Sequence, residues 1–234
     1  MSPRGIARTA GALYLLVIVA GIFAEMFVRS TLVVRDDAAA TIANIAAWEP
    51  LFRLGLVADL VAAAAYLGVT FLLFLLLRRV NEALALLSLV LGTSGSIIMA
   101  GNLLNLFAPL LALKLGAGVT EQLQWQALMA LRLHGVGYSL SIVFFGAHLL
   151  TLGLLALRSS FAPRLIGWLL AIAGPAWLGY TLLQFLAPAS ADHLFPYVPV
   201  LSLIAEGALA LWLLLARGTS FGDGRAREDK AAIG

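Results

Sequence analysis

The sequence predicts an all-α protein in which six helices cross a membrane as a polytopic bundle. Of its 234 residues, 62% are apolar and only 12% are charged, which is far outside the composition of soluble globular proteins. The apolar residues gather in six runs, each longer than the roughly 20 residues that a helix needs to cross a bilayer. Because the runs lack the alternation of β-barrel strands, helices are the expected spanning structure.

The predicted spans are, in order, Ile6–Val28, Leu51–Leu77, Ala83–Leu113, Gln122–Leu157, Leu165–Leu186 and Phe195–Ala216. The first run imitates a secretory signal, because Arg4 and Arg8 precede its apolar core. We interpret it as a span, since the run continues past Glu25 and its removal would leave an odd number of spans. The six spans form one predicted transmembrane domain over residues 1–217.

A short amphipathic helix is predicted between the first two spans. The stretch "DDAAATIANI", residues 36–45, opens with two aspartates that can cap a helix and places Ile42 and Ile45 on one face. We expect this helix to lie on the outer surface, where it could act as a lid.

Small residues and prolines mark two of the later spans. Small side chains, which let helix backbones approach closely, are Ser88, Gly92, Gly95 and Ala100 in the third span and Gly167 and Ala171 in the fifth. Pro109 and Pro175 should bend the same two helices. Of the two, Pro175, which follows Gly174, is the one we expect to kink its helix.

The charged residues between the spans predict the orientation. With a cytoplasmic N-terminus, the inner side carries ten basic residues, Arg4, Arg8, Arg78, Arg79, Arg158, Arg164, Arg217, Arg225, Arg227 and Lys230, and the outer side three, Arg29, Arg35 and Lys114. This asymmetry predicts that both termini are cytoplasmic. Residues 218–234 are polar and are predicted to form a disordered cytoplasmic tail. The net charge of +3 has this topological explanation, so no nucleic-acid partner is expected.

The absence of cysteine excludes several kinds of site. Disulfides, thiolate metal sites, iron–sulfur clusters and covalently attached haem all need cysteine, and the chain has none. The three histidines follow no HxxxH or HExxH spacing. We therefore expect no metal and no cofactor.

Polar residues inside the spans predict a site. In "LFRLGLVADLVAAAAYLG", residues 51–68, an arginine and an aspartate interrupt an apolar run. At a rise of about 1.5 Å per residue, the polar residues of the first four spans gather near the outer edge of the hydrocarbon. We predict a polar cup there that binds a ligand through Glu25, Arg53, Asp59, Asn102, Asn105, Arg132, His134 and Tyr138.

Two further polar residues lie deeper. His148 is about 15 Å above Arg158 and Glu206 about 16 Å above Arg217, which places both near the midplane. A charged side chain at that depth costs about 2.5–3.5 kcal/mol, so it normally faces a partner or water. We expect His148 and Glu206 to floor the cup and to relay a proton.

The mixed charges of the cup indicate what it could bind. Arg53 and Arg132 could hold an anionic group, while Asp59, Glu25 and Glu206 could hold a cation or a proton. This predicts a membrane protein that binds or transports a small molecule, a lipid headgroup or a proton-coupled solute. Membrane lipids are its expected partners, and the sequence leaves open whether the protein forms a homo-oligomer.

Other interpretations remain open from the residues alone. The charges could be ion pairs that fix which helix neighbours which. His134 could act as the base of an intramembrane enzyme on a lipid or quinone, with its catalytic residues unknown. His134 and His148, fourteen residues apart on one face, could also bind haem non-covalently.

Five stretches resemble one known family: "ARTAGALYLLVIVAGIFAE", "LFRLGLVADL", "GNLLNLFAPLLAL", "LHGVGYSLSIVFFGAHLL" and "FAPRLIGWLLAIAGPAWL". They are similar to the bacterial membrane family known as domain of unknown function 4386, over about residues 5–216. The resemblance implies a six-helix, multi-pass protein of the bacterial inner membrane. It implies no catalytic role for any residue.

Overall fold

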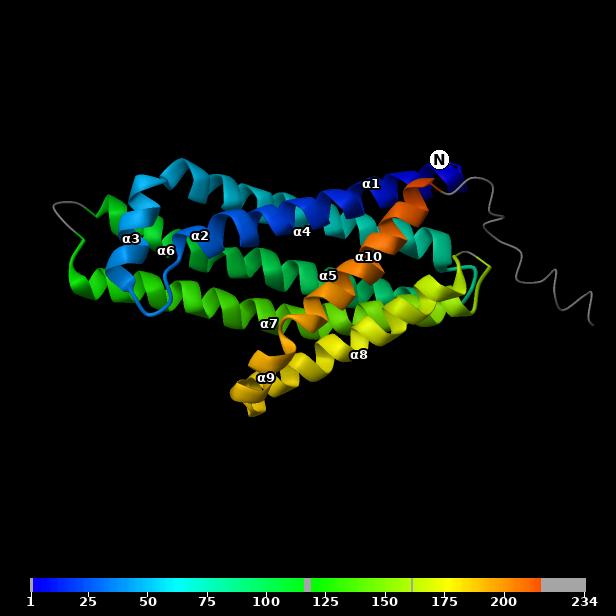
Figure 1. Cartoon of the computed structure of the whole chain (residues 1–234). Helices are drawn as coiled ribbons and strands as arrows, with labels where there is room; N and C mark the ends of the chain where they lie inside the picture. The colour runs from blue at the N-terminus through cyan, green and yellow to red at the C-terminus, as the bar shows by residue number, and fades with distance from the viewer. Residues whose placement is uncertain (1, 116–118, 161, 216–234) are drawn as a thin grey trace, which may run out of the picture. The chain divides into compact units, whose positions relative to one another are not determined.

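The computed structural model describes residues 2–115, 119–160 and 162–215, and within them every regular element is a helix (Figure 1). The tail predicted over residues 218–234 lies outside the described residues. Six helices are long and apolar enough to cross a membrane: Pro3–Leu32, Glu49–Leu77, Glu82–Lys114, Glu121–Leu157, Arg164–Leu186 and Tyr197–Leu215. The predicted all-α, six-span architecture is therefore confirmed, and the chain is an integral membrane protein.

The structure divides these spans into shorter helical elements. They are α1 (Pro3–Ile22), the π-helix η1 (Phe23–Arg29), α2 (Ser30–Leu32), α3 (Ala38–Ala47), α4 (Glu49–Leu77), α5 (Glu82–Asn102), the 3₁₀-helix η2 (Leu103–Leu106), α6 (Phe107–Lys114), α7 (Glu121–Leu157), α8 (Arg164–Leu186), α9 (Pro188–Leu194) and α10 (Tyr197–Leu215). Glu49, Glu82 and Glu121 lie in the first turns of their helices. A carboxylate there favours helix initiation, because it opposes the positive end of the helix dipole.

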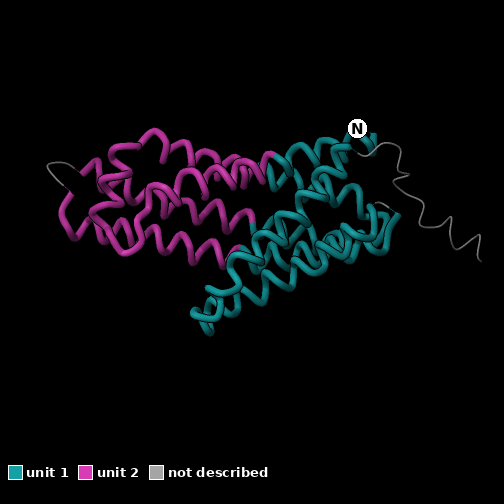
Figure 2. Tube along the Cα trace, in the orientation of Figure 1, with its two compact units in different colours: residues 1–15, 65–95, 142–234 teal, residues 16–64, 96–141 magenta. Residues whose placement is uncertain are grey.

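The chain forms two compact units (Figure 2). Unit 1 contains residues Met1–Leu15, Ala65–Gly95 and Ile142–Gly234, and unit 2 contains Leu16–Ala64 and Ser96–Ser141. The helices α1, α4, α5 and α7 each contribute one part to unit 1 and another to unit 2.

In unit 1, glycines bring α7 and α8 into backbone contact. A Cβ atom built on Gly153 would lie 2.5 Å from the backbone nitrogen of Ala171, and one on Gly174 would lie 2.5 Å from the carbonyl oxygen of Gly146. A Cβ on Gly167 would lie 2.8 Å from the side chain of Leu157. The small residues predicted to pack in the fifth span therefore do so.

In unit 2, the short helix α3 confirms the predicted amphipathic helix and shows what covers it. The Asp37 side chain caps the helix by accepting a 2.8 Å hydrogen bond from the backbone nitrogen of Ala40. Ile45 is buried in a cluster with Val28, Leu32, Phe52 and residues of α6 and α7. The apolar face of α3 is thus covered by protein, so the helix is part of the unit 2 core rather than a helix resting on lipid.

Two spans depart from regular α-helix, both within unit 2. The first span contains the π-helix η1 between α1 and α2, and the third is interrupted by η2, which lies just before Pro109. Proline cannot donate to the carbonyl four residues earlier, and its ring clashes with that carbonyl, here of Asn105 in η2. Helix α8 continues through Pro175. The expectation that Pro175 kinks this helix therefore stays a prediction.

Candidate functional site

Polar side chains from different helices meet in two clusters, one within each unit. The Arg29 cluster in unit 2 consists of Glu25, Arg29, Asp59, Asn102, Asn105 and His134. The Glu206 cluster in unit 1 consists of Tyr14, Tyr66, Ser88, His148, Ser202 and Glu206.

The guanidinium of Arg29 bridges two carboxylates. Its Nε donates to Oε2 of Glu25 at 2.8 Å, Nη1 is ion-paired with Oδ2 of Asp59, and Nη2 lies 3.4 Å from Oδ1 of Asp59. The side chains of Arg29 and Asp59 are 13% and 12% exposed, whereas that of Glu25 is 66% exposed. Arg29 therefore links a carboxylate inside unit 2 to one at its surface.

The π-helix η1 positions this bridge. Ala24 and Val28 are buried and hold the inner side of η1 against unit 2, while Glu25 and Arg29 lie on a different side. A π-helix is rare, and single turns of it are frequent at functional sites. From this turn, Arg29 reaches Asp59 on α4.

Asn102 and His134 form the second part of the Arg29 cluster. The Asn102 Nδ2 donates to the carbonyl of His134 at 2.7 Å and lies 3.1 Å from its Nδ1, and Asn105 donates to Oδ1 of Asn102 at 3.0 Å. Both Asn102 and His134 are buried. Gly137 makes the contact possible, because a Cβ atom there would collide with the Asn102 side chain.

The Arg29 bridge and the Asn102–His134 pair lie close enough to interact electrostatically. The charges of Arg29, Asp59 and Glu25 all act on the imidazole of His134. The cluster thus brings together five residues that the sequence assigned to the polar cup, Glu25, Asp59, Asn102, Asn105 and His134, together with Arg29.

Arg53 and Arg132 do not join this cluster, which corrects the sequence-based expectation. The Nε of Arg53 donates to Glu49 at 2.6 Å, four residues earlier on its own helix. Arg132 is ion-paired with Asp36, and the side chains of both residues are more than half exposed. Tyr138, also assigned to the cup, is 40% exposed.

Arg29 is the residue of this cluster that the sequence-based prediction did not include. It was counted with the outer connection, because the apolar run ends at Val28. The signal that could have found it is the spacing of four residues from Glu25, which pairs the two charges if the helix continues past Val28.

In unit 1, the carboxylate of Glu206 accepts two hydroxyl hydrogen bonds. Tyr14 donates to its Oε2 at 2.7 Å and Ser202 to its Oε1 at 2.5 Å. The hydroxyls of Tyr14 and Tyr66 are 3.5 Å apart. Both tyrosines are buried and Glu206 is partly buried. Among the described side chains, no Arg, Lys or His forms an ion pair with Glu206.

His148 lies beside this network without bonding to Glu206. Its Nδ1 is 2.7 Å from the carbonyl oxygen and 3.0 Å from the hydroxyl of Ser88, and its ring meets that of Tyr66 edge to face at 5.8 Å. The Nε2 atom is buried and has no hydrogen-bond partner among the described residues. The two residues predicted to floor the cup together are thus separated by the tyrosines.

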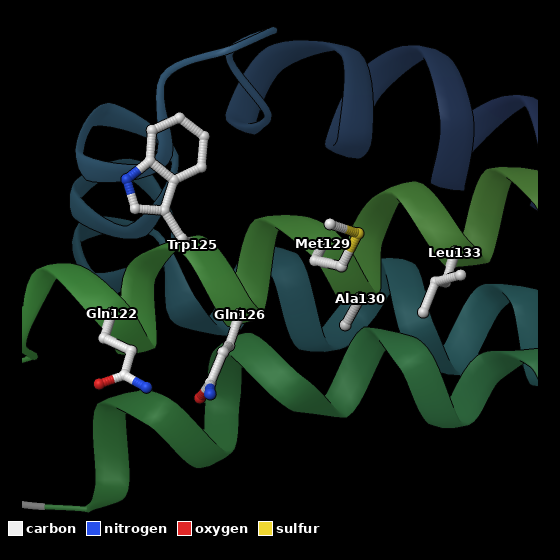
Figure 3. Close-up of a pocket in the computed structure, with 6 residues that line it drawn as sticks. All are labelled: Gln122, Trp125, Gln126, Met129, Ala130 and Leu133. Atoms are coloured by element: carbon white, nitrogen blue, oxygen red, sulfur yellow. The ribbon is translucent and has the colours of Figure 1, made fainter.

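A shallow depression lies along α7 within unit 2 (Figure 3). It is lined by Gln122, Trp125, Gln126, Met129, Ala130 and Leu133, all from this one helix. None of the residues assigned to the polar cup lines it. In the described part of the chain, no three His, Cys, Asp or Glu side chains are grouped as metal ligands.

A match to a family model shows which protein family the chain belongs to. The model of the family described as domain of unknown function, DUF4386, matches residues 9–217. The chain belongs to this family. The match to DUF4386 includes every residue of the Arg29 and Glu206 clusters. No curated protein and no solved structure matches the chain.

Proposed function

We propose that this integral membrane protein binds an organic cation at the Arg29 cluster, as the ammonium group of an amine-bearing amphiphile. The main support for the proposal is that two carboxylates pair with the single positive charge of Arg29. One guanidinium is shared by the carboxylates of Glu25 and Asp59, so this triad retains one negative charge. A cation is the ligand that neutralises it.

The positions of the other two arginines support a cation over an anion. Arg53 and Arg132 were the groups expected to hold an anionic ligand. Each is already paired with its own carboxylate, Glu49 and Asp36 respectively. The two arginines of the predicted cup therefore form ion pairs at other places in unit 2.

The exposure of Glu25 indicates how such a ligand could reach the cluster. Its carboxylate lies next in sequence to Met26 and Phe27, whose side chains are also exposed. An amphiphile could place its ammonium group on Glu25 and its hydrocarbon chain on these two side chains. Such a ligand is either a membrane lipid with an amino headgroup or a free amphiphilic amine.

The local backbone also favours a functional site over a purely structural one. Glu25 and Arg29 lie on a π-helical turn, and Asn105 lies on the 3₁₀-helix η2. Helical irregularities of this kind are less favourable than regular α-helix and cluster where a protein binds or reacts. His134 is engaged by Asn102, which favours binding over a role as a catalytic base.

We place the protein in the bacterial plasma membrane with both termini in the cytoplasm, on the strength of the basic-residue asymmetry. In that orientation the Arg29 cluster opens toward the outer leaflet. Transport of the bound cation would be a further step, and the proposal concerns its binding.

The test compares two exposed carboxylates of unit 2 that each pair with an arginine four residues later. Glu25→Gln removes the carboxylate that we propose as the ligand contact, and Glu49→Gln is the matched control. We expect dodecylamine to raise the melting temperature of the wild type and of Glu49→Gln but not of Glu25→Gln. Dodecanoate, which has the opposite charge, should raise none of them.

The source of the ammonium group is tested in lipid nanodiscs. If the ligand is a lipid, phosphatidylethanolamine should be retained by the wild type in native mass spectrometry and lost from Glu25→Gln, with phosphatidylglycerol unaffected. If it is a free amine, only dodecylamine should discriminate the two variants. Equal stabilisation of Glu25→Gln and Glu49→Gln by dodecylamine would overturn the proposal.

A further inference from the structure

The Glu206 cluster of unit 1 takes no part in cation binding at Arg29, and its chemistry is different. We propose that Glu206, Tyr14, Tyr66 and His148 form a proton relay, in which the two tyrosine hydroxyls connect the Glu206 carboxyl to Nε2 of His148.

The first step rests on the surroundings of Glu206. Its carboxylate is held by Tyr14 and Ser202, both neutral donors, and has no cationic partner among the described side chains. A carboxylate within an apolar span is costly unless it binds a proton or a cation. When Glu206 is protonated, the Tyr14 oxygen at 2.7 Å can accept its hydrogen.

The second step rests on the pair of tyrosine hydroxyls. The Tyr14 and Tyr66 oxygens are 3.5 Å apart, and either one can be the donor. A hydroxyl can donate and accept at once, so this pair can pass a proton in either direction. Burial of both rings removes water as a competing partner.

The third step rests on the tautomer of His148. A carbonyl oxygen can only accept, so the 2.7 Å contact with Ser88 requires the hydrogen of the neutral imidazole to lie on Nδ1. The lone pair is then on Nε2, which is buried without any donor. An unsatisfied buried acceptor is costly, so its retention needs an explanation. The Tyr66 ring packs directly against this imidazole.

The relay consists of three proton transfers. The Glu206 carboxyl gives its proton to the Tyr14 oxygen, Tyr14 gives its own to Tyr66, and Tyr66 gives its own to Nε2 of His148. Three O–H bonds break, while two O–H bonds and one N–H bond form, leaving a carboxylate and an imidazolium. The last transfer requires the Tyr66 side chain to move so that its oxygen comes within hydrogen-bond distance of Nε2, because no hydrogen bond joins them in this structure.

The helices packed around Glu206 supply the titratable groups that act on it. These are Tyr14 on α1 and Tyr66 on α4, and His148 on α7 contacts the network through Tyr66. Ser202 on α10 is a neutral donor.

The first measurement is infrared difference spectroscopy of the protein in nanodiscs during acidification. We expect a carboxylic-acid C=O band that is absent from Glu206→Gln. Tyr14→Phe should move this band to higher frequency, because the carboxyl loses a hydrogen-bond partner. Tyr180→Phe is the matched control, since the Tyr180 hydroxyl bonds Gln184 rather than Glu206. No band that depends on Glu206, or an equal shift in Tyr180→Phe, would overturn the proposal.

The second measurement follows the same band after a rapid pH jump, together with the imidazolium band of His148. Tyr66→Phe should slow the appearance of the imidazolium at least tenfold, whereas Tyr180→Phe should leave its rate unchanged. If Tyr66→Phe fails to fold, Tyr14→Phe tests the same path, because it removes the other hydroxyl of the relay. An unchanged rate in Tyr66→Phe, or in Tyr14→Phe where the first variant fails, contradicts the relay.

Discussion

The hydroxyl of Tyr14 on α1 donates a 2.7 Å hydrogen bond to Glu206 on α10, a residue 192 positions away in the sequence. This bond depends on how closely α1 and α10 approach. Near Tyr14 on the same helix, a Cβ atom built on Gly11 would lie 2.6 Å from the backbone nitrogen of Leu214 and 2.7 Å from the carbonyl oxygen of Ala210. The absence of a side chain at Gly11 therefore sets the position of Tyr14 against Glu206.

Gly11→Ala should destabilise the protein, because the added methyl group would push α10 away from α1. Overpacking of this kind costs about 1–3 kcal/mol. Gly21→Ala on the same helix is the control, since nothing lies within 4 Å of a Cβ atom there. We expect Gly21→Ala to be neutral or to stabilise the helix by up to about 1 kcal/mol. Thermal unfolding in detergent measures both, and equal melting temperatures would show that the crossing tolerates a side chain.

Removing Asp59 should destabilise the protein, because Arg29 would lose the carboxylate that it pairs with inside unit 2. We expect Asp59→Leu to destabilise the protein by about 2–4 kcal/mol. The double variant Arg29→Met with Asp59→Leu should recover much of this loss, because it leaves no unpaired charge inside unit 2. Arg53→Met, which breaks a half-exposed pair, should cost no more than about 1 kcal/mol. A double variant less stable than Asp59→Leu would contradict the pairing.

Gly137→Ala should displace Asn102 from His134, because its methyl group would occupy the space of the Asn102 side chain. We expect a loss of about 1–3 kcal/mol and a changed ¹⁵N signal of the His134 ring. Gly135→Ala, two residues earlier on α7, should change neither, since nothing lies within 4 Å of its Cβ position. An unchanged His134 signal in Gly137→Ala would show that Asn102 is not held at this contact.

The predicted orientation is testable because the chain contains no cysteine. Ser190 on α9 and Ser160 between α7 and α8 are both exposed. Ser190→Cys should react with a membrane-impermeant maleimide in intact cells, and Ser160→Cys only after the cells are opened. The tail position Ser220, which should behave like Ser160, lies outside the described residues. The reverse pattern would place both termini outside and remove the basis for the proposed leaflet.

The sequence by itself determined the fold class, the six spans and the short helix α3. The reason is that these features depend on local properties. Hydrocarbon requires every backbone group to bond within its own helix, so runs of about 20 apolar residues identify spans without knowledge of their neighbours. The cap at Asp37 and the spacing of Ile42 and Ile45 are equally local.

Only the tertiary structure decided which polar residues meet. The sequence predicted Asp59 and Arg53 in one polar cup and left out Arg29, which is the partner of Asp59. It assigned no role to Tyr14 or Tyr66. The spacing of four residues is compatible with the pair of Arg29 and Glu25. It does not give the contact of Arg29 with Asp59 on α4, because the π-helix η1 changes the usual advance of 100° per residue within the first span. The partners of Glu206 depend on how closely α1 approaches α10, and the contacts at Gly11 determine that approach. Because the two helices are far apart in the sequence, the sequence alone does not reveal it.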